Sequence, residues 1–436
     1  MASPAVDADA EPLPPPPPPS TEEEEEEGQQ QPPLDGTRVF GEGAEAASAL
    51  VTWAASAARL PPLRTLDLRF SDEIDGQALA CLGSHARGLT SLRLDGCRNV
   101  VTSISKTAEE STRKDDEEKD DDAEKDETQQ HSAPELAAVL ARSSKTLRSL
   151  SLYWIPRLPS DVVYAVAAAC RNLTSLNLSG CTRAVDDNAL LALAASLGGS
   201  GGGGGGRRSE SASGNSGSRG GNSSGGSSRG LRRLDLTRCQ LLTDPGMARA
   251  FRLMPRLQDL RLYAVESFGD EAARALCVSE EKSEDGNGNG NGSAGGDKGN
   301  ENDDKTKTET EPSFSRLEVL DVCGARDLSD AAAAELVAKR CRGALKVLGC
   351  GWVPNVGNKL AEALARFCPS LESLSFHGNR NLTDQGFDAL VSGLSPHRKL
   401  RALDVRGCVG VAEAKRSKEA LRELFGEQLV EFALQR

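Results

Sequence analysis

The chain has 436 residues, 11 cysteines, only 4% aromatic residues and a formal net charge of -13. Segments of biased composition carry the acidity: the net charge is -10 over residues 1–35, -7 over 102–132 and -6 over 279–312, against +3 over 198–230, which leaves about +7 for the rest. Cysteines without a secretory leader or a Cys-x-x-Cys pair are typical of reduced thiols in the cytoplasm or nucleus. The longest apolar stretch near the start, residues 46–60, is too short and interrupted to span a bilayer, so no membrane role is expected.

Residues 1–36 form a tail in which a polyproline run precedes an acidic run. Such a composition cannot support a core, so the tail is predicted to be disordered. The next segment, about 43–62, contains an Ala-rich stretch that predicts a helix from Ala46 to Ala58, with Leu50 and Trp53 available for packing. We expect this helix to cap the open end of the body that follows.

From residue 63 onward, the pattern Leu-x-x-Leu-x-Leu, or a close variant of it, recurs ten times. The repeats begin at Leu63, Leu89, Leu147, Leu173, Leu231, Leu257, Leu317, Leu345, Leu371 and Leu400. Uninterrupted steps are 26, 28 or 29 residues long, within or at the edge of the range of leucine-rich repeats. Three steps of 58, 58 and 60 residues each contain a biased segment. These segments, about 102–132, 198–230 and 279–312, are therefore predicted to be disordered insertions within single repeats.

The spacing within one repeat predicts a short strand followed by a helix. In the repeat that begins at Leu173, Leu176 and Leu178 point to one side of the strand, and Ala189 and Leu193 recur downstream at helical spacing. One repeat cannot bury its apolar face alone, whereas stacked repeats share a continuous core. The predicted fold of residues 37–436 is thus an α/β solenoid, a horseshoe of about ten repeats. A parallel sheet lines its concave face, helices lie outside, and a C-terminal cap covers about 415–436.

The cysteines fall at fixed positions of this repeat. Cys97, Cys181, Cys239 and Cys408 each lie three residues after the last strand leucine or its equivalent, and Cys170, Cys341 and Cys368 lie at helix ends, as in ACRNLTSLNLSGC. With the sequences LLTDPGM and NLTDQGF leading into helices, the chain resembles the cysteine-containing leucine-rich repeats of F-box proteins and of antagonist-of-mitotic-exit-network proteins. That resemblance implies protein recognition, in the first case of substrates for a ubiquitin ligase of the SCF type. No stretch of the chain matches an F-box.

The same cysteines could be read as metal or redox sites. Other repeats place Ile155, Ala325 or Asn379 at the equivalent position, which favours a structural role, since no metal ligand is replaced by an alkyl group. The sequence contains no HExxH or GxxxxGK[ST] motif, and GxSxG occurs only within the Gly/Ser-rich segment 198–230, where glycine runs match such a pattern by chance. We therefore expect neither an enzyme nor a cofactor or metal.

Aromatic residues indicate where a partner binds. Tyr153, Tyr263 and His377 are expected to point from their strands into the concave face, and Trp154 and Trp352 follow at the edge where strand meets loop, where packing is an alternative to binding. Charged residues of both signs decorate the same face, among which Arg93, Arg233, Arg261 and Asp404 are candidate contacts. A nucleic-acid-binding face would show one sign, so alternation favours a protein partner.

The sequence therefore predicts a monomeric, non-enzymatic scaffold that binds a protein on its concave face, with ubiquitin-ligase subunits as candidate partners by resemblance. One alternative is a structural or regulatory protein whose insertions and acidic tail make the contacts while the solenoid spaces them. A more distant alternative is RNA binding by the basic body of the chain.

Overall fold

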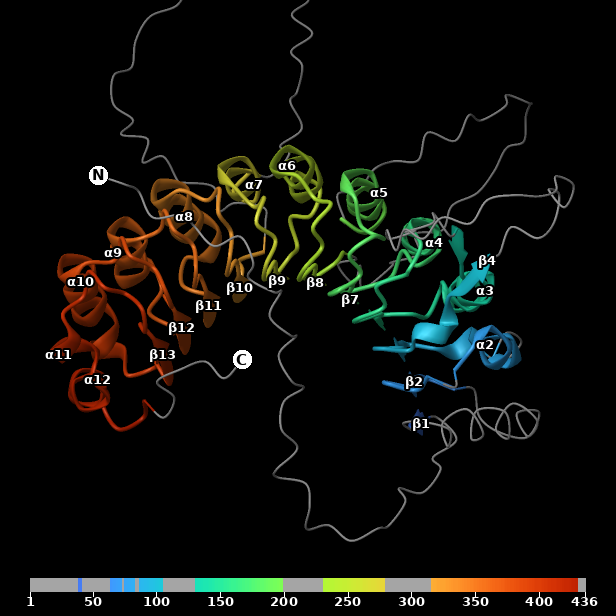
Figure 1. Cartoon of the computed structure of the whole chain (residues 1–436), viewed down its shortest axis with the longest axis horizontal. Helices are drawn as coiled ribbons and strands as arrows, with labels where there is room; N and C mark the ends of the chain where they lie inside the picture. Colours follow the sequence, from blue (N-terminus) through green and yellow to red (C-terminus); the bar gives the residue numbers. More distant parts are fainter. Residues whose placement is uncertain are drawn as a thin grey trace, which may run out of the picture.

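The computed structural model describes residues 38–40, 63–72, 74–82, 86–104, 130–198, 230–278 and 315–429. The helix expected at about 43–62, most of the tail and most of the three insertions lie outside these residues. The described residues form an arc of stacked coils, with strands along the inner curve and helices along the outer one (Figure 1). The horseshoe of leucine-rich repeats predicted from the sequence is confirmed.

Each of the ten leucine motifs forms one three-residue strand, and all ten pair in parallel, in sequence order, within one sheet. The middle leucines are in register, so that Leu150 pairs with Leu176 and Leu176 with Leu234. An eleventh strand, β1 (Arg38–Phe40), pairs with β2 and was not predicted. The ten strands are β2 (Thr65–Asp67), β3 (Ser91–Arg93), β6 (Ser149–Ser151), β7 (Ser175–Asn177), β8 (Arg233–Asp235), β9 (Asp259–Arg261), β10 (Val319–Asp321), β11 (Val347–Gly349), β12 (Ser373–Ser375) and β13 (Ala402–Asp404).

A helix returns the chain from the end of one strand to the start of the next, so the arc has two distinct edges. The strand-end edge holds the helix N-termini, and the strand-start edge holds the helix C-termini. The helices on the outer curve are α2 (Gly76–Leu82), α3 (Pro134–Ser143), α4 (Ser160–Ala169), α5 (Asp187–Leu197), α6 (Asp244–Arg252), α7 (Asp270–Ala275), α8 (Asp330–Leu336), α9 (Asn358–Phe367) and α10 (Asp384–Leu394).

The core lies between the sheet and the helices. Strand leucines such as Leu176 and Leu178, and helix residues such as Ala189 and Leu193, are 0–1% exposed and belong to one continuous cluster. Burial of a leucine side chain contributes about 1.5–3 kcal/mol. Because every coil repeats the contribution, the arc is held together by nearest-neighbour packing.

The second and third insertions join the arc at one edge, and the first insertion joins it at the other. The second follows α5 and the third follows α7, both at the strand-start edge. The first lies between β4 (Thr102–Ile104) and β5 (Gln130–Ser132), an antiparallel pair outside the main sheet, before α3 at the strand-end edge. At the C-terminal end, α11 (Glu413–Arg416) and α12 (Lys418–Phe425) follow β13, and Leu421 and Phe425 of α12 are 2% exposed.

Candidate protein-binding face

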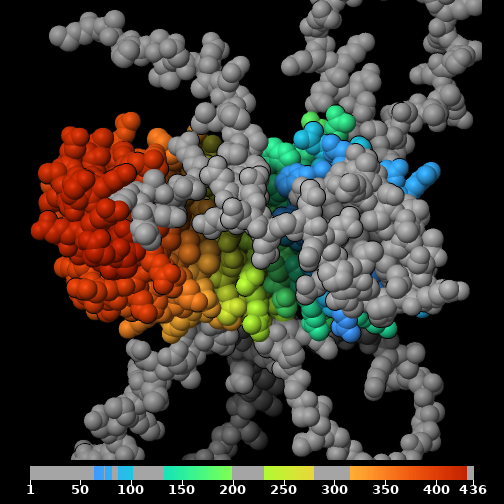
Figure 2. All heavy atoms as spheres, turned by 90° about the horizontal axis from the view of Figure 1, so that it is seen from below, coloured from blue at the N-terminus to red at the C-terminus, as the bar shows by residue number. Residues whose placement is uncertain are grey.

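The inner side of each strand presents two side chains, and a third inward side chain follows two positions after the strand. Figure 2 looks onto this concave side, on which the coils succeed one another from the N-terminal end in blue to the C-terminal end in red. We group these side chains into four columns that run across the sheet from coil to coil. The first and last residues of each strand fill the first and second columns. The residue after the next leucine, or its equivalent, fills the third column, and the residue that follows it fills the fourth. The nine candidate residues from the sequence all lie in these four columns.

The fourth column has a left-handed backbone in every coil. Five coils place glycine there, whereas the others place Phe70, Trp154, Arg238, Ala264 and Trp352, with φ between 55° and 61°. A non-glycine residue pays about 1–2 kcal/mol in this conformation, and residues so strained cluster at functional sites. Three of the five are aromatic, and Phe70 and Trp352 are 48% and 59% exposed.

Each of these aromatic rings lies over a glycine of the next coil. A Cβ atom at Gly180 would lie 2.6 Å from Cε3 of Trp154, and one at Gly378 would lie 2.7 Å from Cε3 of Trp352. The pairing of an aromatic residue with a glycine therefore lets the ring lie against the neighbouring backbone while its other side stays open.

Trp352, His377 and Asp404 come together at the C-terminal end of the face. The rings of Trp352 and His377 are 5.0 Å apart between centroids. Asp404, only 2% exposed, accepts a hydrogen bond from Arg406 at 2.8 Å, and its Oδ2 lies 3.1 Å from Nδ1 of His377. Burial disfavours the charged carboxylate, but the bonds from Arg406 and His377 outweigh this effect and lower the pKa of Asp404. Asp404 therefore orients its neighbours, and Trp352 is the exposed member of the group.

Tyr263, Arg261 and Arg233 occupy the middle of the face. Tyr263 is 39% exposed, Arg233 is exposed, and Arg261 forms an ion pair with Asp259 at 3.1 Å. Beside them, the carboxylates of Asp235 and Asp321 accept hydrogen bonds from the backbone nitrogens two residues later, at 3.0 and 3.1 Å. These second-column acids thus shape the turn after the strand, and burial raises the pKa of both.

Tyr153, Trp154 and Arg93 lie toward the N-terminal end. The two aromatic rings are half-buried and 6.1 Å apart, and the guanidinium of Arg238 lies 5.7 Å from the centroid of Trp154. Arg93 forms ion pairs with Asp67 at 3.4 Å and Asp95 at 3.0 Å. The structure therefore divides the candidate residues into three groups along the arc.

Phe70 was not singled out from the sequence, although it occupies the same column as Trp154 and Trp352. An alignment of the ten repeats contains the signal, because glycine fills that column in five of them: Gly96, Gly180, Gly324, Gly378 and Gly407. Frequent glycine at one position marks a left-handed residue. An aromatic residue at such a position is the exception that points to a surface role.

The thiols of the repeat lie in the core and hydrogen-bond to the neighbouring coil. The sulfur of Cys181 lies 3.1 Å from the carbonyl oxygen of Leu152, and that of Cys97 lies 2.8 Å from that of Leu68. At the equivalent position, the amide of Asn379 donates to the carbonyl of Cys350 at 2.8 Å. Burial raises the pKa of Cys181 to about 12. The residues at this buried turn position therefore provide hydrogen-bond partners for the backbone carbonyl oxygens at the strand ends of the neighbouring coil.

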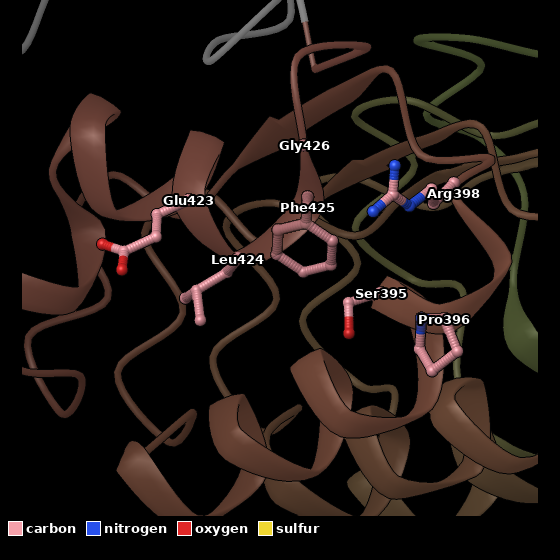
Figure 3. Close-up of a pocket in the computed structure, with 7 residues that line it drawn as sticks. All are labelled: Ser395, Pro396, Arg398, Glu423, Leu424, Phe425 and Gly426. Carbon is pink, nitrogen blue, oxygen red and sulfur yellow. The ribbon is translucent and has the colours of Figure 1, made fainter.

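A shallow pocket of about 250 Å³ lies at the C-terminal end, between the turn after α10 and the end of α12 (Figure 3). No candidate residue of the concave face belongs to its lining. Within the described ranges, no three His, Cys, Asp or Glu residues are grouped to hold a metal ion, and no helix is long and apolar enough to cross a membrane. The lining residues are Ser395, Pro396, Arg398, Glu423, Leu424, Phe425 and Gly426.

The comparison with protein-family models agrees with the repeat architecture. A family model described as Leucine Rich repeat matches residues 169–194 and 227–248, which include β7, most of α5 and β8. No curated protein sequence matches the chain. Among solved structures, the complex of Rad7 and Elc1 from yeast contains a similar chain, with 16% sequence identity and a TM-score of 0.48, over 88% of this chain and 78% of that one.

Proposed function

We propose that this leucine-rich repeat protein, with cysteines in its turns, is a non-enzymatic scaffold that binds a protein partner on its concave face. The observation that carries the proposal is the exposure of Trp352, which is 59% open to solvent although its backbone has a φ of 58°. Large aromatic residues that remain open on a rigid surface are typical anchors of protein interfaces.

Trp352 and Tyr263 are the central anchors of the proposed interface. Tyr263 follows β9 and Trp352 follows β11, so one strand, β10, lies between their coils. Gly349 and Gly351 of β11 and its turn lack side chains, and a Cβ atom at Gly349 would lie 2.6 Å from Oδ1 of Asp321, so a side chain of the neighbouring coil fills that space. Rigid aromatic side chains on a sheet suit contact with a partner's side chains. Arg233, Arg261 and Arg406 supply charge around this area.

Substitution of Trp352 by glycine tests the proposal without disturbing the fold. Glycine already fills the same column in five coils, so it accepts the left-handed backbone and removes about 1–2 kcal/mol of strain. This gain offsets the lost contact of the ring with Gly378. Loss of an anchor typically weakens binding by about 2 kcal/mol or more, roughly 30-fold.

The experiment is affinity capture of the full-length protein from its native cell, followed by titration of the captured partner with purified variants. Trp352→Gly and Tyr263→Ala are each expected to weaken binding, and thermal unfolding checks that both remain folded. Tyr164→Ala is the matched control, because Tyr164 is equally exposed, at 39%, but lies on α4 on the outer curve. Equal binding by all three variants would contradict the proposal.

The alternative that the insertions make the contacts is tested on the same partner. Deletion of 102–132, 198–230 and 279–312 should leave binding intact if the concave face is the site and abolish it if the insertions are. A role in ubiquitination is a further proposal, supported by the resemblance of the cysteine-containing repeats to those of F-box proteins. Recovery of a Skp-type adaptor with a cullin in the same capture would support it, and their absence would count against it.

A further inference from the structure

Positive side chains gather on the strand-start edge of the N-terminal half of the arc. We call the six residues that follow the basic edge, and all six are exposed: Arg64, Arg87, Lys145, Arg148, Arg171 and Arg232. The described loop residues around them, 63–64, 86–90, 144–148, 170–174 and 230–232, contain no acidic side chain. The opposite edge of the same coils is mixed, since Asp72, Asp161 and Asp186 lie there beside Arg98 and Arg183.

Helix ends explain only half of the basic edge. Cations stabilise helix C-termini by about 0.3–1 kcal/mol, which accounts for Arg87, Lys145 and Arg171 just before or after such ends. Arg64, Arg148 and Arg232 lie instead directly before β2, β6 and β8.

Threonine alternates with these three arginines along the sheet. Thr90 and Thr174 fill the same position before β3 and β7, and their hydroxyls donate to the carbonyls of Arg64 and Arg148 at 2.9 and 3.1 Å. With strands about 4.8 Å apart, the three arginines recur roughly every 10 Å. They form a regular row of cations that the helix ends do not explain.

The basic edge lacks what a protein interface requires. Such interfaces depend on buried aromatic or aliphatic anchors. None of the exposed large hydrophobic residues of the described chain, which include Phe70, Tyr164 and Tyr263, lies in the loops of this edge. Binding to phosphates requires cations alone, and arginine is suited to them by its planar group with several donors.

We propose that the basic edge binds the phosphodiester backbone of a nucleic acid without reading its sequence. The described loops of this edge carry no aromatic side chain on which bases could stack, so a duplex with its higher charge density should bind at least as well as a single strand. The alternating charges that disfavour nucleic acid belong to the concave face, which is a different surface. The proposal is therefore independent of protein recognition on that face.

The test is fluorescence anisotropy of the full-length chain with a labelled DNA duplex of about 24 base pairs and, separately, a single-stranded RNA of the same length, between about 50 and 200 mM salt. The affinity is expected to fall steeply with salt. The triple variant Arg64→Glu, Arg148→Glu and Arg232→Glu should reduce the slope of log K against log salt for the duplex by about 3, one for each lost phosphate contact.

The control triple variant Arg98→Glu, Arg157→Glu and Arg183→Glu changes the net charge equally at the strand-end edge of the same coils and should retain binding. Trp352→Gly should also bind the duplex normally, which separates this proposal from the function of the concave face. The proposal is overturned if the chain does not bind either probe at about 50 mM salt. It is also overturned if both triple variants lose binding equally. A third contrary outcome is displacement of the labelled duplex by a polyglutamate peptide that has the same charge and concentration as the duplex.

Discussion

The carboxylate of Asp244 in α6 caps the helix of the next coil: its Oδ1 lies 2.8 Å from the backbone nitrogen of Ala272 and 3.0 Å from that of Gly269. The same relationship recurs along the arc. Asp187 accepts from the backbone nitrogen of Thr243 at 2.9 Å, and Asp330 accepts from that of Leu360, also at 2.9 Å. The first residue of one helix therefore satisfies the open amides of the next.

Asp244→Ala is expected to reduce the free energy of unfolding by about 1–3 kcal/mol, because it leaves the amides at the start of α7 without their acceptor. Urea unfolding of the purified chain measures the change. Asp161→Ala is the matched control, since Asp161 is an exposed acid in the first turn of α4 and tests the helix dipole alone. Equal effects of the two variants would show that the contact between coils contributes nothing of its own.

This capping between coils gives the structural reason for a motif found at helix starts in the sequence. TDPGM and TDQGF were recognised as helix starts, but the partner of each polar residue lies one coil away. A Cβ at Gly246 would lie 1.9 Å from Cγ of Asp187, and one at Gly386 would lie 2.3 Å from Oδ1 of Asn358. Glycine is thus needed where the side chain of the preceding coil crosses. Pairings between coils of this kind follow from strand register and the path of the loops, which spacing along the chain does not define.

The sheet itself was predictable because every strand repeats the same apolar spacing, and the inward position of Tyr263 follows from alternation along a strand. Strand β1 was missed because Arg38–Phe40 lacks the leucine pattern. The basic edge was missed for a geometric reason. Its residues lie in loops and before strands, so the edge becomes continuous only when coils are stacked. Asp404 was assigned to the surface by the same alternation, but Arg406 and His377 enclose its carboxylate.

Two acids of the second column should respond to pH with opposite signs. The pKa of Asp404 is lowered in the folded chain, so its contribution to stability is complete above the ordinary pKa of aspartate, near 4, and is lost as pH falls through the lower folded value. Asp404→Asn should therefore destabilise the protein at neutral pH, by on the order of 1 kcal/mol. The difference from the unsubstituted chain should shrink in acid, as measured by urea unfolding between about pH 3 and 7.

Asp321→Asn should instead stabilise the protein. Burial raises the pKa of Asp321, so its cost in stability is absent below the ordinary pKa of aspartate, grows as pH rises above that value and is complete above the folded pKa. Asn177 is the precedent in the same column, because its Oδ1 accepts from the nitrogen of Ser179 at 2.9 Å without charge. The gain at neutral pH is expected on the order of 1 kcal/mol. A loss of stability would show that attraction to Arg261 exceeds the cost of burial.

The buried thiols should be inert in the native protein. Burial raises the pKa of Cys170 and Cys181 to about 12, so almost no thiolate is present at neutral pH, and neither side chain is exposed. Alkylation by iodoacetamide, followed by mass spectrometry, should modify them only on the timescale of unfolding. Cys277 is half-buried, and burial raises its pKa less, to about 11, so it serves as an internal reference that should react sooner. Rapid labelling of Cys181 in the folded chain would contradict the structural role of the buried cysteines.

Arg340 connects the two coils on either side of the third insertion by hydrogen bonds. It lies in the π-helical turn Val337–Cys341, is 1% exposed, and its Nη2 donates to the carbonyls of Pro255 and Leu257 at 2.9 and 3.2 Å. Burial lowers its pKa to about 10, so it remains charged at neutral pH. Arg340→Met preserves much of the volume but leaves both carbonyls without this donor, which should cost about 2–4 kcal/mol of unfolding free energy.

Arg366→Met is the matched control, because Arg366 lies in the last turn of α9 and its guanidinium lies 5.1 Å from the ring of Phe367. Hydrogen exchange should locate the effect of Arg340→Met in β9 and β10, the strands on either side of residues 279–312. If exchange accelerates uniformly along the arc, the contribution of Arg340 is not local. If it does not change, the two carbonyls find other donors and Arg340 does not join these coils.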